Sequence, residues 1–329
     1  MKKRVLATLA ALILATGSLF SQTTLADVIN EFNAGVESLN EQSYETALAQ
    51  FNNSLALSDQ VGDEANDMKV KAQEQIVGTH YRQAMTLMKR KQYDMALPSL
   101  EKTVQYSEEY GAQEEFATKA KRYLPPLYLR QGNILLQQSK YDEALVTFNN
   151  VLEMKPNMYK AHQGKGLVYK ELGEVDKMLE EFAIAKEKAT QKGDDELIDN
   201  INAAINDYYR GLIEEELMYM DTEDPDYTFL LDITEQALQA NDKNSYAYWQ
   251  AASARNKMIE FDLAIELATA ALAYETDPVL VSALSYELGL AYQNTANYTE
   301  ACEAYNNVTE EPFLSKAEKK LSTPQLGCE

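Results

Sequence analysis

The sequence predicts an all-α protein, an α-solenoid of about seven helix-turn-helix repeats, and three observations support this prediction. Only 13 Gly and 8 Pro interrupt 329 residues, which favours long helices over many short strands. Apolar residues make up 45% of the chain, too large a share for a disordered protein. One amphipathic segment occurs twice, as SYETALAQFNNSL at 43–55 and as KYDEALVTFNNVL at 140–152. A segment repeated in this way indicates an array of similar structural repeats.

The repeated segment has a fixed pattern of spacings around a central residue, which we call the anchor. Ala144 has Tyr141 three residues before it, Phe148 four residues after it and Gly132 twelve residues before it. The pattern recurs, four times closely, twice in part and once weakly, around the anchors Ala47, Ala96, Ala144, Met178, Leu230, Ala264 and Ala301. Apolar residues at helical spacing flank a short polar break such as QQSK, so each copy predicts a pair of antiparallel helices.

The small and aromatic residues of the pattern indicate how the helices contact each other. A Gly or Ala twelve residues before the anchor, together with the anchor itself, allows the two backbones of a pair to approach closely. The aromatic residue four positions after the anchor is expected to fill the space toward the next pair. One helix pair cannot bury its own apolar face, so the copies are expected to stack around a continuous core.

This pattern resembles that of the tetratricopeptide repeat (TPR) family. The segment ALVTFNNVLEMKPNMYKAHQGKGLVYKELGEVDKMLEEF, from Ala144 to Phe182, matches the family pattern, with Gly166, Tyr169 and Gly173 in register. The resemblance extends over roughly residues 28–311. It implies a right-handed α-solenoid that binds other proteins.

Three intervals between successive copies are longer than the family period of 34 residues. They measure 48 to 52 residues, and each begins with a glycine linker, at Gly62, Gly111 and Gly193. Glycine commonly takes the left-handed conformation just past a helix end, so the extra residues are expected to lengthen the next first helix. Pro125 and Pro126 are expected to break the extension in the third copy.

The N-terminus resembles a bacterial secretory signal. Lys2, Lys3 and Arg4 precede an apolar stretch over residues 5–15, and a short polar region follows. We expect a signal peptide at 1–21, with cleavage near residue 26 as the alternative, and an exported protein that is periplasmic or secreted. The cleavage region contains no Cys for lipoprotein acylation, and no stable membrane insertion is expected after cleavage.

The formal net charge of −22 limits the range of partners. Such a surface repels phosphate backbones and anionic lipids, so nucleic acid is not an expected partner. Solubility alone explains the charge, and a docking surface for a basic partner is the alternative.

No motif in the chain indicates catalysis. The two histidines, His80 and His162, both lie sixteen residues before an anchor, where other copies have the bulky residues Tyr128 and Tyr248, so they are expected to be packing residues. No HExxH, CxxC, GxSxG, Walker A or GxGxxG pattern is present. We therefore expect a protein that is not an enzyme and that uses no cofactor or metal.

The TPR resemblance implies that the first helices of successive pairs line a concave binding face. Positions fifteen, eleven and eight residues before each anchor are expected to point there, which selects Tyr81, Met85, Met88, Leu129, Asn133, Gln163, Lys170, Trp249, Ser253, Asn256, Tyr286 and Gln293, with Leu136, Leu167 and Leu290. This mixture of aromatic rings, methionines and amides suits a peptide ligand. Contact between neighbouring repeats is the alternative role for the apolar members.

Three functions are compatible with this pattern. The first is an exported scaffold that binds another protein or peptide in an envelope, secretion or surface-assembly complex, and the repeat array favours it. The second is a structural subunit that associates with itself. The third is an enzyme or glycan-binding protein with a hidden site, in which Tyr248, Trp249 and Tyr286 stack on sugar.

The chain contains only two cysteines, Cys302 and Cys328. Cys302 lies on the last predicted helix pair, whose outer face needs a cap, and residues 312–329 are expected to supply that cap with a short helix at 315–321. An exported compartment permits oxidation, so a Cys302–Cys328 disulfide is expected, with two free thiols as the alternative.

Overall fold

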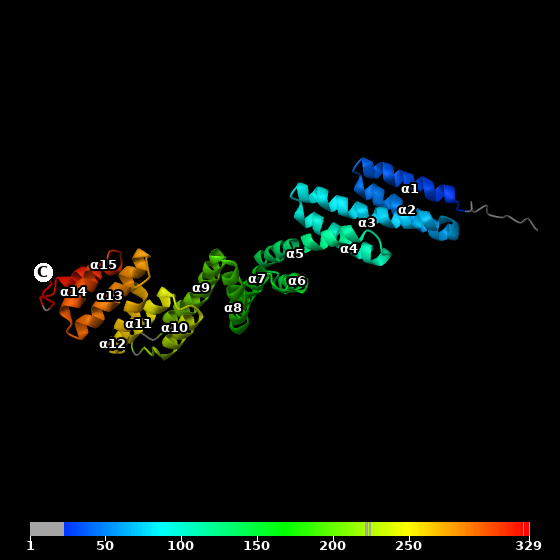
Figure 1. The fold of residues 1–329 in the computed structure, drawn as a ribbon. Helices are drawn as coiled ribbons and strands as arrows, with labels where there is room; N and C mark the ends of the chain where they lie inside the picture. Colours follow the sequence, from blue (N-terminus) through cyan, green and yellow to red (C-terminus); the bar gives the residue numbers. More distant parts are fainter. Residues whose placement is uncertain (1–22, 221–222, 224, 325, 329) are drawn as a thin grey trace, which may run out of the picture. The chain divides into compact units, whose positions relative to one another are not determined.

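The computed structural model describes residues 23–220, 223, 225–324 and 326–328. The predicted signal peptide at 1–21 lies outside these residues. Within the described residues the regular structure is entirely helical and contains no strand, which confirms the all-α prediction (Figure 1). None of the described helices is both long and apolar enough to span a bilayer.

The helices group into two compact units that meet between Arg130 and Gln131, inside α5. Unit 1 contains α1 (Leu25–Asn40), α2 (Tyr44–Val61), the short 3-10 helix η1 (Asp63–Ala65), α3 (Asn66–Lys89), α4 (Tyr93–Tyr110) and most of α5 (Glu114–Gln137). Unit 2 contains the end of α5 and then α6 (Tyr141–Met154), α7 (Tyr159–Leu172), α8 (Val175–Lys192), α9 (Asp195–Tyr219), α10 (Thr228–Ala240), α11 (Ser245–Lys257), α12 (Phe261–Leu272), α13 (Pro278–Asn294), α14 (Tyr298–Asn306) and α15 (Phe313–Leu321).

The anchors confirm the predicted division into helix pairs. Each anchor lies on the even-numbered helix of a pair, from Ala47 on α2 to Ala301 on α14, and all seven side chains are at most 2% exposed. Even the weak copy around Leu230 forms such a pair, α9 with α10. At the five positions where the anchor is alanine, the small side chain lets the two helices of a pair approach closely.

The aromatic residue four positions after the anchor contacts the glycine of its own pair. A Cβ atom added to Gly132 would lie 2.5 Å from the Phe148 ring. The same close contact joins Gly35 to Phe51, Gly166 to Phe182, and Gly289 to Tyr305. Phe148 also contacts Gly164 of the following pair, as expected, so this ring fills space both within its own pair and toward the next one.

The long intervals lengthen first helices, as predicted. Helices α3 and α5 have 24 residues each and α9 has 25. Gly111 and Gly193 adopt the left-handed conformation at the preceding helix ends, whereas Gly62 combines a positive φ of 83° with a ψ of −146°. All three glycines therefore end a helix with a positive φ.

The prediction that Pro125 and Pro126 break α5 was wrong, because the helix continues through both. Each proline in a helix interior costs about 3 kcal/mol or more through a lost hydrogen bond and a steric clash. The flanking Leu124 and Leu127 are buried in the core of unit 1, and the residues one turn earlier, whose carbonyls lose their partners, are exposed to water. Tertiary burial on one face and hydration on the other offset the local penalty.

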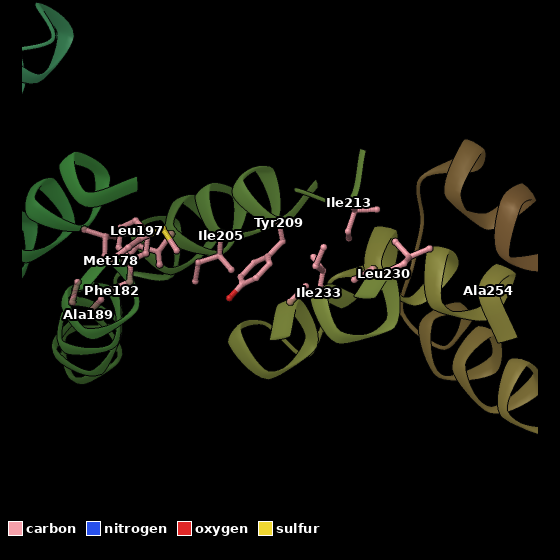
Figure 2. Packing of buried hydrophobic residues seen from close by; sticks show 14 residues of the cluster. Met178, Phe182, Ala189, Leu197, Ile205, Tyr209, Ile213, Leu230, Ile233 and Ala254 are labelled. Atoms are coloured by element: carbon pink, nitrogen blue, oxygen red, sulfur yellow. The ribbon is translucent and has the colours of Figure 1, made fainter. Parts of the chain in front are cut away.

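Stacked pairs share a continuous core in unit 2. Met178 and Phe182 from α8, Ile205 and Tyr209 from α9, and Leu230 from α10 belong to one buried cluster (Figure 2). The cluster crosses the boundary between two helix pairs. Neither pair could exclude water from these side chains alone, which is the physical basis of the repeat architecture.

Candidate peptide-binding groove

A groove of about 580 Å³ opens in unit 1 between α3 and the turn that joins α1 to α2. Leu39, Tyr44 and Met85 supply apolar surface. Arg82 lies in the second half of α3, and Arg90 directly follows the end of that helix. The helical spacing of Arg82, Met85 and Lys89 places all three side chains along one side of α3. The groove therefore combines an apolar floor with cationic side chains.

Ring contacts and a hydrogen bond hold the aromatic walls of this groove. The hydroxyls of Tyr44 and Thr86 are 2.8 Å apart, which links the start of α2 to α3. The Tyr81 ring stacks on Phe116 of α5 with ring centroids 4.8 Å apart. Burial raises the pKa of Tyr81, so its hydroxyl stays neutral at ordinary pH. Tyr44 and Tyr81 therefore each contact another part of the fold and also line the groove.

A neighbouring groove of about 530 Å³ shares Tyr44, Thr86 and Arg90 with the first one. Glu45 and Asp94 also line this second groove. Arg90 therefore stands between a cationic groove and a more acidic one.

The twelve candidate binding residues have different surroundings within their units. Tyr81 and Met85 line the groove of unit 1, while Met88 packs against the core formed by α4 and α5. Leu129 and Gln163 are partly buried, Asn133 is exposed, and Lys170 forms an ion pair with Asp207 of α9. The candidates on α11 and α13 contact other parts of unit 2.

The C-terminal helix covers the aromatic candidates Trp249 and Tyr286. Phe313 of α15 lies edge-on to Trp249, with ring centroids 5.5 Å apart, and 6.0 Å from the Tyr286 ring. Lys316 lies 5.9 Å above the Tyr286 ring. Phe313 is only 7% exposed. Two of the three candidates for sugar stacking, Trp249 and Tyr286, are therefore in contact with the C-terminal helix, and the third, Tyr248, packs against the buried cluster of α11, α12 and α13.

The amide and hydroxyl candidates nearby bond to neighbouring helices. Asn256 donates from Nδ2 to the Glu287 carboxylate at 2.8 Å, and the Ser253 hydroxyl also bonds this carboxylate. Burial raises the pKa of Glu287 even with these partners. Gln293 accepts a hydrogen bond from the Tyr305 hydroxyl at 2.9 Å. These polar groups join α11 to α13 and α13 to α14.

The C-terminal segment packs against the last helix pair. Helix α15 spans Phe313–Leu321, and a disulfide joins Cys302 on α14 to Cys328, with Cα atoms 5.7 Å apart. Phe313, Ala317 and Leu326 are buried against the last helix pair.

A further groove of about 590 Å³ lies in unit 2 beside the second helices α8 and α10. Val175, Leu179 and Tyr209 form its apolar part, and Asp176 and Lys186 lie at its rim. It contains none of the twelve candidate binding residues.

Comparison with known proteins identifies a protein family whose models match two segments of this chain. Models of the tetratricopeptide repeat family match residues 129–192, which span the end of α5 through α8, and residues 283–312, which span α13 and α14. The chain contains tetratricopeptide repeats in these segments. No curated protein matches the chain.

Several solved TPR structures are similar to this TPR protein at low sequence identity. A thermophilic TPR protein of Thermus thermophilus is 21% identical and covers 60% of this chain and 100% of its own, with a TM-score of 0.27. The TPR2AB domain of yeast Sti1, in complex with pHSP90, is 14% identical and covers 92% of this chain and 97% of its own, with a TM-score of 0.35. YrrB, a TPR protein with an unusual peptide-binding site, is 20% identical over 59% of this chain and 91% of its own, with a TM-score of 0.31.

The histidines of the TPR array have different surroundings. His80 is buried and stacks on Tyr106 with ring centroids 5.4 Å apart, as a packing residue should. Burial, with a smaller effect of Lys102, lowers the pKa of His80 to about 4. The packing role expected for His162 was incomplete, because its Nδ1 atom lies 2.7 Å from a carboxylate oxygen of Glu181.

Glu181 connects His162 to a lysine. Lys165, one turn further along α7, forms an ion pair with the same carboxylate. Burial alone would raise the pKa of Glu181, but His162 and Lys165 outweigh it and lower that pKa. This cluster fastens α7 to α8 within one TPR pair. Among the described residues, no group of three or more His, Cys, Asp or Glu side chains is arranged to hold a metal ion.

The sequence reasoning missed the cationic residues of the groove. Arg82, Lys89 and Arg90 do not fall on the selected offsets, because these offsets describe the centre of a concave face. A signal was present in the sequence: residues 75–93 contain four cations and no Asp or Glu, in a chain of net charge −22.

Proposed function

We propose that this TPR protein is a scaffold that binds a peptide segment of another protein in the groove of unit 1. The observation that carries the proposal is the position of Tyr81 and Met85: two residues selected from the repeat pattern line an open groove of about 580 Å³. The groove offers methionine and tyrosine surface beside polar groups, a combination that recurs in peptide recognition. The corresponding aromatic residues of unit 2 are covered by α15.

Selection of phage-displayed random 12-residue peptides on the immobilised full chain tests this proposal. Affinities of the selected peptides are then measured for the native protein and for Met85→Ala. Truncation of an anchor residue is expected to weaken binding by about 1–2 kcal/mol. The matched control is Leu179→Ala in the groove of unit 2, which should leave the affinity unchanged.

Two results would count against the proposal. Peptides that bind Met85→Ala normally but lose affinity for Leu179→Ala would place the binding surface beside α8 and α10. A library that yields no binding peptide would speak against peptide recognition by this chain.

We also propose that the protein is exported and acts in an envelope, secretion or surface-assembly complex. The basic and apolar N-terminal segment supports export. The Cys302–Cys328 disulfide supports it independently, because disulfides persist in oxidising compartments.

Fractionation of a bacterial host that expresses the full chain, compared with a variant lacking residues 2–21, tests export. The full chain should leave the cytoplasm and titrate no free thiol after denaturation without reductant. The shortened variant should remain inside with both thiols free. Retention of the full chain in the cytoplasm with two free thiols would contradict the proposal.

A further inference from the structure

Charge is distributed unevenly in this strongly acidic chain. Residues 131–329 contain more than twice as many acidic as basic side chains. In contrast, residues 75–93 contain Arg82, Lys89, Arg90 and Lys91 and no acidic residue. These positions belong to the second half of α3 and to the turn after it. The chain therefore concentrates positive charge at one place on an otherwise negative molecule.

Three of these four cations, Arg82, Lys89 and Arg90, line the groove of unit 1. None of them forms an ion pair with a residue that the structure describes, although four other cations of unit 1 do, in the pairs Lys69–Asp59, Lys119–Glu115, Lys121–Glu108 and Arg130–Asp94. The three groove cations are thus free to bind an anionic group from outside.

The boundaries of the cationic region are set by nearby carboxylates. Glu45 and Asp94 line the adjoining groove, which shares Tyr44 and Arg90 with the first one, and neither of them lines the first groove. An anionic ligand is attracted to the side of Arg82 and repelled on the side of Glu45. The surface that attracts an anionic ligand is therefore limited to the groove of unit 1.

We infer that the partner segment bound in the groove of unit 1 is an acidic peptide. Its carboxylates pair with Arg82 and Arg90, and an apolar side chain of the peptide contacts Met85 and Tyr44. Guanidinium groups bind carboxylates through paired hydrogen bonds, which gives orientation as well as attraction. This inference rests on the proposed function, because it specifies the chemistry of the peptide at the same groove.

The size and charge of the molecule favour a peptide over larger anions. A long nucleic acid or an anionic membrane extends well beyond the groove and meets the negative remainder of the chain. A short acidic segment places its charge only where Arg82, Lys89 and Arg90 lie. The apolar floor formed by Leu39, Tyr44 and Met85 adds contact area that a simple anion cannot use.

The selected phage peptides also test this inference on the full chain. They should be enriched in Asp and Glu relative to the unselected library. A synthetic copy of the strongest peptide is compared with a version in which Asp becomes Asn and Glu becomes Gln. The neutral version should bind about tenfold more weakly, as expected for the loss of charge-assisted hydrogen bonds.

A charge-matched pair of protein variants locates the effect. The Arg82→Gln/Arg90→Gln variant should bind the acidic peptide about tenfold more weakly, which corresponds to about 1.4 kcal/mol. The Lys71→Gln/Lys102→Gln control removes the same charge from exposed positions outside the groove and should bind normally. Raising the salt concentration should weaken binding to the native protein and have little effect on the arginine variant.

Four outcomes overturn the inference. The first is selection of neutral or basic peptides, and the second is an equal loss of affinity in both charge variants. The third is an unchanged affinity of the arginine variant combined with weaker binding to Met85→Ala, in which case the proposed function stands. The fourth is tighter Arg82-dependent binding to phosphatidylglycerol vesicles or oligothymidylate than to any selected peptide. If the library yields no peptide that binds, both the inference and the proposed function are contradicted.

Discussion

Single residues in the turns inside the helix pairs adopt an uncommon backbone conformation. Six residues, each five positions before an anchor, have positive φ angles: Gln42, Lys91, Ser139, Gly173, Ile259 and Ala296. Only one of them is glycine, for which this conformation is unstrained. The turn geometry is therefore imposed by packing of the two helices and tolerated by side chains that disfavour it.

Ile259 is the most strained of these residues, because its β-branched side chain sits at a φ of 65°. The side chain is 74% exposed, so its removal costs little packing. Ile259→Gly is expected to raise the free energy of unfolding by about 1 kcal/mol, measured by chemical denaturation. The control Ala270→Gly, at an exposed position inside α12, should lower it by about 1 kcal/mol. A lower stability of Ile259→Gly would mean that this conformation carries no strain.

Two helical glycines should respond oppositely to the same substitution. A Cβ atom at Gly132 would meet the buried Phe148 ring at 2.5 Å, so Gly132→Ala should destabilise the protein by about 1–3 kcal/mol. At Gly211 nothing lies within 4 Å, so Gly211→Ala should stabilise it by about 0.5–1 kcal/mol through the unfolded state. Thermal melts of both variants provide the comparison, and equal effects would refute the close contact at Gly132.

His80 makes stability depend on pH. Burial lowers its pKa from 6.5 to about 4, so it is neutral in both states above pH 6.5 and has no effect there. As pH falls from 6.5 toward 4, the unfolded chain binds a proton that the folded chain excludes, and the free energy of unfolding decreases by at most about 3 kcal/mol. His80→Phe keeps a ring beside Tyr106 and should reduce this loss when denaturation at pH 7.5 and pH 4.5 is compared. If the free energy of unfolding decreases by the same amount in His80→Phe, other groups cause the pH dependence.

At the scale of elements, α15 acts as the cap of the last helix pair and as a cover for Trp249. Trp249 is the single tryptophan of the chain, so its fluorescence reports this contact directly. Phe313→Ala removes the ring against the indole, and the emission of Trp249 should shift to longer wavelength as water enters. The control Lys319→Ala changes an exposed residue of the same helix and should leave the emission unchanged. An unshifted spectrum in Phe313→Ala would show that another group covers the indole.

The elements also show which local rules tertiary packing can override. The two prolines of α5 carry a strong helix-breaking signal, yet the helix continues because Leu124 and Leu127 are buried on one side of it. Gly111 and Gly193 end their helices as the local rule predicts, because a left-handed residue at a helix end conflicts with no packing contact.

At the scale of the whole molecule, the net charge of −22 opposes the compact state. Salt screens this repulsion, with a Debye length of about 8 Å at physiological ionic strength. The melting temperature measured by calorimetry should therefore rise by several degrees between about 10 mM and 150 mM sodium chloride. A chloride-specific effect is excluded if sodium fluoride gives the same rise. A melting temperature that falls with salt would indicate that attractive ion pairs dominate instead.

The sequence by itself determined the repeat register and the all-α fold. The offsets around Ala144, with the glycine twelve residues before it and the aromatic residue four after it, are short-range features that recur closely in four of the seven copies. Apolar residues at helical spacing must face a common core, so all seven anchors are buried as the pattern requires. The need to cover the last helix pair predicted a C-terminal cap, whereas the sequence left open whether Cys302 and Cys328 form a disulfide or remain two free thiols.

Only the tertiary structure decided which of the predicted binding residues remain open. Whether Trp249 faces solvent depends on Phe313, which lies 64 positions later in the chain and contacts it across the last helix pair. The groove of unit 1 depends likewise on how the turn before Tyr44 meets Arg82 and Arg90 on α3. Such contacts join residues that are distant in sequence and unrelated by the repeat. Periodicity therefore predicts which faces are buried, whereas long-range packing decides which cavities persist and which charges surround them.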